Sequence, residues 1–555
     1  MFDIFRTATL DRRHFLQGTV GGLGLSLRLI GEEPQKKSDR VRQAANITVE
    51  GAKRIGTASP LLFGSMLENW PAGPSEKPDD LRNGIYGSVW VGEDSPLANI
   101  RGMRKDTLEA NRRLGPTVVR WPGGTGAGVY HWMEGIGTQA RRVPALATWR
   151  RDMVEPYTFG TYEFIDFCRE IGAEPYINVN VGTGSPEEAA NWVEYCNRSG
   201  KTRYAALRAS NGRTEPFGIK YWGIGNELYS PGEIGHMNPE QHAQAVLAYA
   251  GIMRRVDQNI KIVAVGHTGE FFGQNTGDEW NRRLLQTAGK AIDFISLHRY
   301  YHEDDHYRLL ACPIQTEIVL GNWRKMIDEY RPKAVVGAKP ERVLIAVDEW
   351  NSWHGNTGPY YKLPLSDGLF SALMFHVFIR NCDIVGMANY CNLVNSDPCS
   401  MIVTDQNRVY TNPMGLAFEL YRRYTGSTAV HVKAEVDGYD AGKISTAGES
   451  STMPINHVPY LDSVATIDEQ RQKLYLSVVN RHREQDIDCT VEVKDLSVDK
   501  RGVVQELNAP DATTVNDFDS PNHVTVRERS VVIALPRFDH VFPAHSATVI
   551  ELSLS

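Results

Sequence analysis

One pattern constrains the fold more than any other: a short apolar run ends in polar or glycine residues, and an amphipathic stretch follows it. Eight such runs occur between residues 59 and 395. They are SPLLFGSMLENW, TVVRWPGG, PYINVNVGTG, IKYWGIGNE, KIVAVGHTG, AIDFISLHRYY, VLIAVDEW and IVGMANYCNLVN. Apolar runs that alternate with helices are typical of parallel strands, and eight of them predict closure into a (β/α)8 barrel.

The stretches between these runs carry helical signals. FGTYEFIDFCREIG places Phe164, Cys168 and Ile171 at helical spacing. SPEEAANWVEYCN begins with Ser185, three residues before Glu188, which is the pattern of a capping box at a helix N-terminus. PEQHAQAVLAYAGIMRRV and DGLFSALMFHVFIRNC are longer segments of the same kind. The sequence therefore predicts helices between consecutive strands of an α/β barrel domain.

Beyond about residue 424 the pattern changes to short alternating strands separated by polar turns. SVATIDEQRQKLYLSVVNRH, DCTVEVKDLSV, SVVIALPRF and SATVIELSLS show this alternation without a helical period. We therefore expect the barrel over residues 57–424 and an all-β, jelly-roll-like sandwich over residues 425–555. The strand-like segment 45–56 precedes the barrel and is expected to pair with the C-terminal domain.

Residues 1–44 have the features of an export signal followed by a charged linker. DRRHFLQGTVGGLGLSL places Arg12 and Arg13 before Phe15 and Leu16, and a glycine-rich, weakly apolar run follows. This resembles a twin-arginine export signal, whose cargo folds before it crosses the membrane. The expected location is the periplasm or the outside of the cell. The alternative is a disordered N-terminal tail on a cytoplasmic protein.

Composition excludes several classes of function. The chain of 555 residues has a net charge of -7 and a pI near 6.2, so no basic surface for nucleic acid is expected. No segment of about 20 apolar residues is present to span a membrane. The seven cysteines are odd in number and lack CxxC spacing, which indicates buried thiols in a protein that folds in a reducing compartment.

Two carboxylates stand at the ends of predicted barrel strands, where functional residues of such barrels lie. Glu227 follows the apolar run in YWGIGNE and Glu349 follows the one in VDEW. They fall on the fourth and seventh strands, so they face each other across the barrel mouth. Glycoside hydrolysis uses such a pair: one carboxylic acid protonates the leaving oxygen, and the other attacks as nucleophile or activates water. Asn226 is suited to bind a sugar hydroxyl, and Arg120 to hold a neighbouring carboxylate ionised.

Other interpretations of these residues stay open at this point. Glu227 and Glu349 would also suit a structural ion-pair network at the strand ends. His298, His302 and His306 recur every fourth residue in HRYYHEDDH, and on a helix they would share a face suited to zinc. The preceding AIDFISLH is typical of a strand that enters a loop, so we expect no metal site.

Several motifs carry a family resemblance. RWPGG, FGTYEFIDFCREIGAEPYINVNVGTGSPEEAANWVEYCN, KYWGIGNE, EIGH, ISLHRYY and VDEWNSW occur in this order. In order and spacing they resemble the α-L-arabinofuranosidases of glycoside hydrolase family 51. The late VFPAHSATVIEL is similar to the final strands of the family's C-terminal domain. The resemblance covers most of the chain and implies a (β/α)8 barrel followed by a β-sandwich, which agrees with the fold predicted above.

The resemblance implies a role for each matching residue. Glu227 matches the acid/base, and Glu349 matches the nucleophile of a retaining enzyme. Tyr300 matches a tyrosine that positions the nucleophile. Further substrate-binding residues of the family match Glu68, Asn226, His298 and Trp149.

The chain departs from the family at two positions. Thr125 stands after PGG, where many members have Asn or Cys, and Gly126 and Gly128 follow it. Asn392 stands before LVN, where the family usually has Gln. Both positions line the subsite of the non-reducing sugar in the family. We therefore expect Thr125 and Asn392 to contact the substrate in a roomier or differently shaped pocket.

The resemblance implies a retaining exo-glycosidase that removes terminal α-L-arabinofuranosyl residues from plant-type polysaccharides or oligosaccharides, without a cofactor. One alternative is the same mechanism on a β-D-galactofuranoside, a xylan or a glucan. Another is a carbohydrate-binding barrel without catalysis. The expected partner is a carbohydrate, with no nucleic acid and no membrane. The family is often oligomeric, which leaves a homo-oligomer open.

Overall fold

The computed structural model describes residues 43–68, 84–146, 154–268, 270–271, 274–275, 277–330, 342–353, 362–395, 399–444, 454–533 and 536–555. Two predictions lie outside these residues: the export signal, with its linker up to residue 42, and the substrate contact of Trp149. Among the described helices, none combines the length and the apolar character needed to cross a bilayer.

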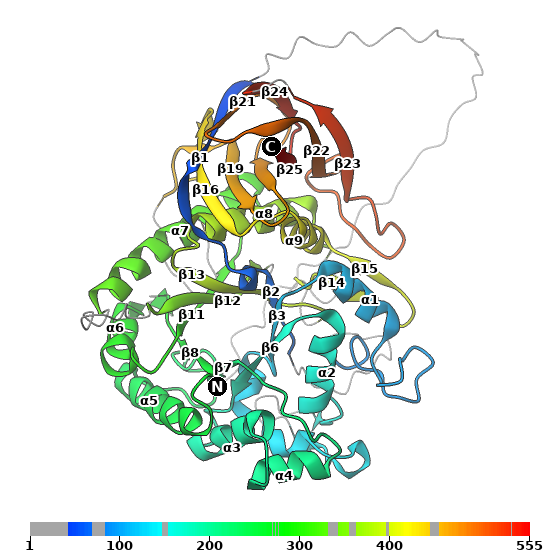
Figure 1. Ribbon diagram of the computed structural model, residues 1–555, viewed down its shortest axis with the longest axis vertical. Coiled ribbons are helices and arrows are strands. Elements are labelled where there is room, and N and C mark those ends of the chain that lie inside the picture. The colour runs from blue at the N-terminus through cyan, green and yellow to red at the C-terminus, as the bar shows by residue number, and fades with distance from the viewer. Residues whose placement is uncertain are drawn as a thin grey trace, which may run out of the picture. The chain divides into compact units, whose positions relative to one another are not determined.

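Eight parallel strands close into a barrel, in the order β2-β3-β6-β7-β8-β11-β12-β13 (Figure 1). The strands are β2 (Gly64–Met66), β3 (Val118–Trp121), β6 (Glu174–Val179), β7 (Tyr221–Ile224), β8 (Lys261–Val265), β11 (Phe294–Tyr301), β12 (Leu344–Ser352) and β13 (Val385–Tyr390). Each of the eight apolar runs contributes one strand, so the predicted (β/α)8 barrel is confirmed.

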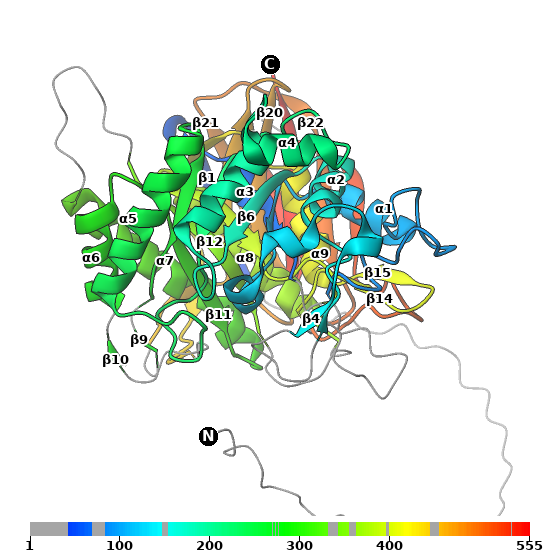
Figure 2. The same cartoon turned by 90° about the horizontal axis from the view of Figure 1, so that it is seen from below.

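Helices surround the barrel strands (Figure 1 and Figure 2). They are α1 (Lys105–Leu114), α2 (Thr161–Ile171), α3 (Pro186–Asn197), α4 (Arg203–Ser210), α5 (Pro239–Val256), α6 (Gly277–Ala288), α7 (His306–Glu329), α8 (Leu365–Arg380) and α9 (Pro413–Arg423). Ser185 caps α3 as predicted, because its hydroxyl accepts from the Glu188 amide at 3.1 Å. The Glu188 carboxylate bonds to His131 Nδ1 at 2.9 Å instead of the cap. Only half of the predicted capping box therefore forms.

Large side chains fill the barrel below its C-terminal rim. One buried core cluster takes a single residue from each of seven strands, namely Val118, Tyr176, Tyr221, Val263, Phe294, Ala346 and Met387. Such layers make the interior of an eight-stranded barrel a packed core and not a pore. This packed layer therefore supports the strand ends that lie above it.

The C-terminal domain is all-β, as predicted. Eight of its strands join β1 in one nine-stranded sheet, in the order β23-β22-β25-β20-β19-β16-β1-β21-β24, and β17 (Gly438–Tyr439) pairs separately with β18 (Val458–Pro459). The nine strands of the sheet are β1 (Gln43–Thr57), β16 (Thr428–Glu435), β19 (Leu461–Asp468), β20 (Lys473–Asn480), β21 (Ile487–Lys494), β22 (Val498–Asn508), β23 (Thr525–Val532), β24 (Arg537–Phe542) and β25 (Ser546–Leu554). β1 runs antiparallel to β16 and parallel to β21. Since hydrogen bonds join all nine strands into one sheet, the finer description as a jelly-roll-like sandwich stays a prediction.

A buried ionic cluster joins the barrel to this domain. Asp462 on β19 accepts from His376 Nδ1 at 2.6 Å and Arg380 Nη1 at 2.7 Å, both on α8. It also accepts from Arg481 Nη2 at 2.9 Å. Burial raises the pKa of Asp462, but the charges of Arg380 and Arg481 outweigh burial and hold the pKa well below its usual range. The carboxylate is therefore ionised and binds residues of both domains.

We predict that Asp462→Asn lowers the free energy of unfolding at neutral pH by roughly 3–5 kcal/mol, because Arg481, whose side chain is 1% exposed, stays buried without its partner charge. Arg380, in contrast, keeps its ion pair with Glu317 at 3.1 Å. Denaturant titration measures the loss. The control is Glu469→Gln, whose ion pair with Arg54 has side chains 53% and 65% exposed, so a change within about 0.5 kcal/mol is expected.

The same carboxylate gives the pH dependence a definite sign. Because the folded pKa of Asp462 is depressed, its contribution is complete above the unfolded value of about 4 and is lost as pH falls towards the folded value. The difference in unfolding free energy between wild type and Asp462→Asn should therefore shrink below about pH 4. A variant as stable as wild type at neutral pH would contradict the prediction.

Candidate active site

A bulge in β12 directs two consecutive acids to one partner. Ala346 of β12 pairs with Ser296 of β11, and Glu349 pairs with His298, so β12 covers three residue steps where β11 covers two. Neighbouring residues of a regular strand point to opposite faces, and an extra residue changes the direction of a side chain. Asp348 and Glu349 consequently both approach Arg120: Asp348 lies 3.8 Å from its Nε, and Glu349 accepts from its Nη1.

Glu349 is held at both oxygens. Oε1 accepts from Arg120, and Oε2 accepts from the Tyr300 hydroxyl at 2.6 Å. The side chain is 7% exposed, so little solvent reaches it. Two donors from two other barrel strands therefore fix the position of this carboxylate.

Glu227 follows β7 and has a strained backbone. Its φ of 40° lies in the left-handed region, which non-glycine residues rarely adopt. Its Oε1 lies 2.8 Å from His298 Nδ1 and accepts from the Tyr229 hydroxyl at 3.2 Å. Burial raises the pKa of Glu227, but the hydrogen bond and the charge of His298 outweigh burial and lower the pKa overall.

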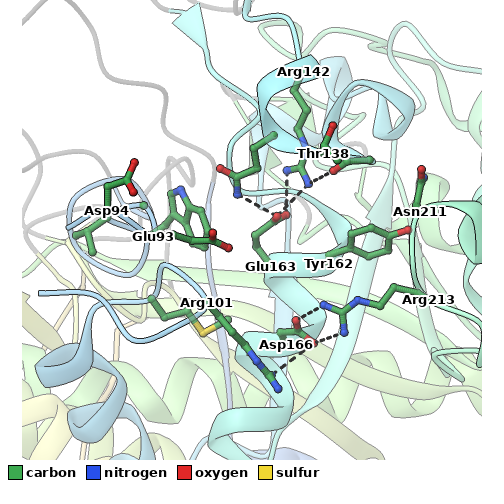
Figure 3. A pocket seen from close by; sticks show the side chains of 16 residues that line it. Glu93, Asp94, Arg101, Thr138, Arg142, Tyr162, Glu163, Asp166, Asn211 and Arg213 are labelled. Atoms are coloured by element: carbon green, nitrogen blue, oxygen red, sulfur yellow. Dashed lines mark hydrogen bonds and ion pairs between the residues drawn. The ribbon is translucent and has the colours of Figure 1, made fainter. Parts of the chain in front are cut away.

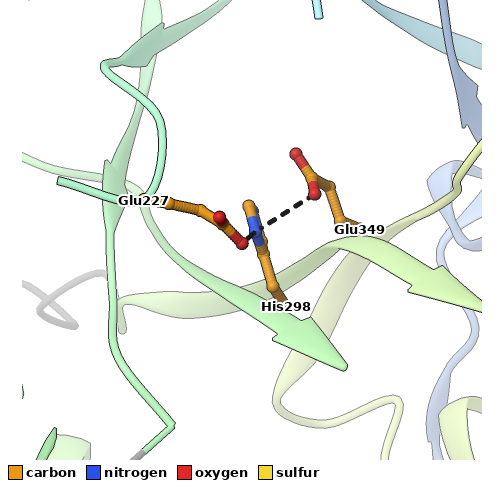
Figure 4. A group of neighbouring side chains, drawn as sticks. All are labelled: Glu227, His298 and Glu349. Carbon is orange, nitrogen blue, oxygen red and sulfur yellow. Dashed lines mark hydrogen bonds and ion pairs between the residues drawn. The ribbon is translucent and has the colours of Figure 1, made fainter. Parts of the chain in front are cut away.

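His298 lies between the two glutamates (Figure 4). Its Nδ1 is 2.8 Å from Glu227 and 3.3 Å from Glu349, and the contacting atoms of the three residues all lie within 4.8 Å of one another. Burial lowers the pKa of His298, but the charge of Glu349 and the bonds to Asp348 and Glu227 raise it to about 10. At neutral pH the imidazole is therefore protonated and carries a proton beside Glu227.

Glu68 and the two asparagines form a second group beside the acids. Glu68 accepts from the Gly124 amide at 2.8 Å and from Asn392 Nδ2 at 3.5 Å. Asn392 is fully buried, and its Oδ1 has no hydrogen-bond partner among the described residues. Asn226 Oδ1 accepts from Arg120 at 2.8 Å. A buried acceptor without a partner is uncommon, and a ligand hydroxyl would satisfy it.

The turn after β3 needs glycine for this arrangement. Gly123 has a φ of 115°, and a Cβ at this residue would lie 2.5 Å from Glu68 Cγ. Any larger residue would displace Glu68 from its bond to Gly124. The PGG motif is therefore explained by the close approach of backbone and carboxylate.

The structure adds residues that the sequence did not single out. Tyr176, in the barrel core, donates to Asp348 at 2.9 Å, and Tyr229 donates to Glu227. Thr125 donates to Glu233 at 2.6 Å, which brings a further carboxyl group to the site. In the sequence, the only indication of a role for these two acids is that Asp348 lies in VDEW, next to Glu349, and that Glu233 lies in EIGH.

The histidine run does not form the helical face that zinc would need. His298 lies in β11, His302 follows that strand, and His306 is the first residue of α7. His306 bonds to the Ser366 hydroxyl at 2.8 Å and to the Arg481 carbonyl at 2.9 Å. The spacing of four residues therefore has no structural meaning here.

A separate pocket of about 670 Å³ lies beside α2 (Figure 3). Within the described part of the chain it shares no lining residue with the candidate active site. Its charged side chains are largely paired: Arg142 contacts Glu163 at 2.9 Å, and Arg213 contacts Asp166 at 2.5 Å. These pairs stabilise the pocket wall.

The fold and this site together define a class of protein. A closed barrel with two carboxyl groups this close at its strand ends is the arrangement of a retaining glycoside hydrolase. Two family models match the chain, the α-L-arabinofuranosidase 1 domain over residues 110–311 and the α-L-arabinofuranosidase C-terminal domain over residues 348–546. The chain belongs to glycoside hydrolase family 51.

Individual relatives agree with this assignment. A probable α-L-arabinofuranosidase C from Aspergillus terreus is 30% identical, over 92% of this chain and 98% of its own length. An intracellular exo-α-L-arabinofuranosidase from Bacteroides ovatus is 29% identical, over 92% and 96%. The crystal structure of an α-L-arabinofuranosidase from Thermotoga maritima in complex with arabinose has a TM-score of 0.82 and 34% identity, over 92% of this chain and all of that chain.

Proposed function

We propose that the protein is a retaining exo-α-L-arabinofuranosidase that removes terminal arabinofuranosyl residues from plant-type polysaccharides or oligosaccharides. The proposal rests on the short distance between the carboxyl groups of Glu227 and Glu349, whose nearest oxygens lie within 4.8 Å of each other. Retaining enzymes hold their two carboxyl groups about 5 Å apart, whereas inverting enzymes leave room for a water. The relatives named for exo-α-L-arabinofuranosidase activity and for bound arabinose support the choice of sugar.

In this mechanism Glu349 attacks the anomeric carbon and Glu227 protonates the leaving oxygen. Water, deprotonated by Glu227, then breaks the glycosyl bond to Glu349 and releases the sugar with retained configuration. Arg120 and Tyr300 hold Glu349 in place for the attack. In the second step the same donors stabilise the negative charge that returns to Glu349 when its bond to the sugar breaks.

His298 is the proposed store of the proton for the first step. We assign this proton to the 2.8 Å contact between His298 Nδ1 and Glu227 Oε1. Movement across this bond makes Glu227 the acid, and it leaves a neutral imidazole beside Glu349. The two groups therefore titrate as a pair and not as separate residues.

Sugar recognition is assigned to the residues around the acids. Asn392 offers a buried acceptor to a sugar hydroxyl, and Glu68 and Asn226 border the same space. Thr125 takes part through its bond to Glu233. Trp149 keeps its proposed substrate contact from the family resemblance alone, because it lies outside the described residues.

We also propose that residues 1–44 direct export through the twin-arginine route. The Arg12-Arg13 pair supports this, and so do the seven cysteines, which are all buried thiols. A protein with buried thiols is suited to folding in a reducing compartment before export. Assembly into a homo-oligomer stays a prediction from the resemblance.

A substrate panel tests the sugar. We expect turnover of nitrophenyl α-L-arabinofuranoside to exceed that of the β-D-galactofuranoside and the β-D-xyloside, with Glu349→Ala as the blank. Preference for another glycoside would show that Thr125 and Asn392 redefine the sugar. Binding of these sugars without any turnover would favour the non-catalytic barrel.

Two variants separate the roles of the acids. Glu349→Ala should lose on the order of 10⁴-fold or more in kcat on every substrate, because no nucleophile remains. Glu227→Ala should lose roughly 10²–10⁴-fold on a substrate with a poor leaving group. With dinitrophenolate as leaving group the loss of glycosylation rate should be far smaller, because this group leaves without protonation.

The matched control is Glu279→Ala, which removes an exposed carboxylate on α6 and should leave kcat unchanged. Equal losses for Glu227→Ala on both leaving groups would argue against its role as the acid. Thermal unfolding of each variant checks that the fold is intact.

Export is tested by the double variant Arg12→Lys, Arg13→Lys. We expect the wild-type protein in the exported fraction of a host with a twin-arginine system and the variant in the cytoplasm. Activity and immunoblots of both fractions measure the distribution. The same cytoplasmic location for both proteins would refute the export proposal and favour an N-terminal tail without a targeting role.

A further inference from the structure

Glu233 lies in the loop that follows Glu227 and is tied to the turn after β3. The Thr125 hydroxyl donates to Glu233 Oε1 at 2.6 Å. Thr125 directly follows Gly124, where a Cβ would lie 2.7 Å from Glu68 Oε1 and 3.3 Å from Glu349 Oε1. The bond therefore anchors the Glu233 carboxyl group to Thr125, one residue after the point where the turn approaches the Glu349 carboxylate.

Backbone contacts between three loops hold Glu233 in this place. A Cβ at Gly182 would lie 2.4 Å from the Gly128 carbonyl oxygen and 2.7 Å from that of Ile234, the residue after Glu233. The loops after β3, β6 and β7 thus touch through their main chains. The glycines after Thr125 predict extra space in the sugar pocket. At Gly128 the backbone of the neighbouring loop fills that space.

The surroundings of Glu233 are acidic. Burial raises its pKa, the charge of Glu227 raises it further, the bond from Thr125 lowers it, and Glu349 and Glu68 add smaller increases, to a value of about 8. Tyr229 also faces the group. At neutral pH the carboxyl group is therefore mostly neutral, and it offers both a hydrogen-bond donor and an acceptor.

We propose that Glu233 is a specificity-determining residue of this site, where its carboxyl group, positioned by Thr125, binds a hydroxyl group of the neutral furanose. The inference rests on the proposed glycosidase function and adds a recognition element to it. The neutral acid donates to the sugar hydroxyl, whereas the ionised form loses this donor and adds a further negative charge beside Glu68, Glu227 and Glu349. Substrate affinity is thus nearly full at pH 7, is halved near pH 8 and falls further as pH rises above that value.

The test is the pH profile of KM, measured apart from kcat on nitrophenyl α-L-arabinofuranoside. If only the neutral form binds, a group with a pKa of about 8 raises KM about tenfold between pH 7 and pH 9. Glu233→Gln keeps the shape and a donor but does not ionise, so its KM should stay flat over this range. The control Glu279→Gln, at the exposed surface of α6, should keep the wild-type profile.

A second variant tests the positioning by Thr125. Thr125→Val removes the hydrogen bond that lowers the pKa of Glu233, so the midpoint of the KM profile should move to higher pH. A residue that only supported the fold would change KM equally at every pH. A tenfold rise retained in Glu233→Gln, or an unmoved midpoint in Thr125→Val, would overturn the proposal.

Calorimetric binding of L-arabinose to Glu349→Ala separates this inference from the proposed function. Because Glu349→Ala removes one of the charges that raise the pKa of Glu233, binding should weaken with rising pH around a midpoint no higher than about 8. This loss in Glu349→Ala but not in the double variant Glu349→Ala, Glu233→Gln supports the inference. Binding that does not depend on pH overturns the inference alone. Absence of both arabinose binding and arabinofuranoside turnover overturns the proposed function, and the inference with it.

Discussion

The site depends on one buried cation, the guanidinium of Arg120. It is 1% exposed, and an unpaired charge at that depth would be strongly destabilising. Glu349 and Asn226 accept its hydrogen bonds, and Asp348 lies within 3.8 Å of Nε. Burial lowers the pKa of Arg120, but the charges of Glu349 and Asp348 raise it well above the usual range. The cation therefore joins the ends of β3, β7 and β12 into one rigid group.

The balance of charge around Arg120 explains why the site retains protons. Asp348, Glu227 and Glu349 face two cations, Arg120 and the imidazolium of His298. Glu68 and Glu233 add further carboxyl groups close by. So many acids in one buried region cannot all ionise at neutral pH, because each negative charge raises the pKa of its neighbours. Enzymes separate the pKa values of neighbouring carboxyl groups by this repulsion. The excess of acids also raises the pKa of His298, which keeps its imidazole protonated beside Glu227.

Local patterns of the sequence predicted the barrel and the position of the acid pair. The eight apolar runs are long enough to define strands, and barrel geometry brings the strand ends together whatever the loops do. The role of Asp348 could not be predicted, because the bulge in β12 is set by its register with β11 and β13. The contact between Thr125 and Glu233 joins residues 108 positions apart, and no pattern within either loop indicates it.

The same contact changes the meaning of the glycine-rich turn. In isolation, TGAG predicts a loop without large side chains and a larger space for the sugar. In the structure, main chains cross so closely beside Gly128 and Gly182 that larger residues would crowd them. This crossing holds Glu233 in place. The Thr125–Glu233 bond thus brings a carboxyl group from the loop after β7 to the turn that follows PGG. Because this contact involves only loops, it leaves the strand ends that hold Glu227 and Glu349 as they are, and loop contacts of this kind can alter the specificity of a barrel without altering its chemistry.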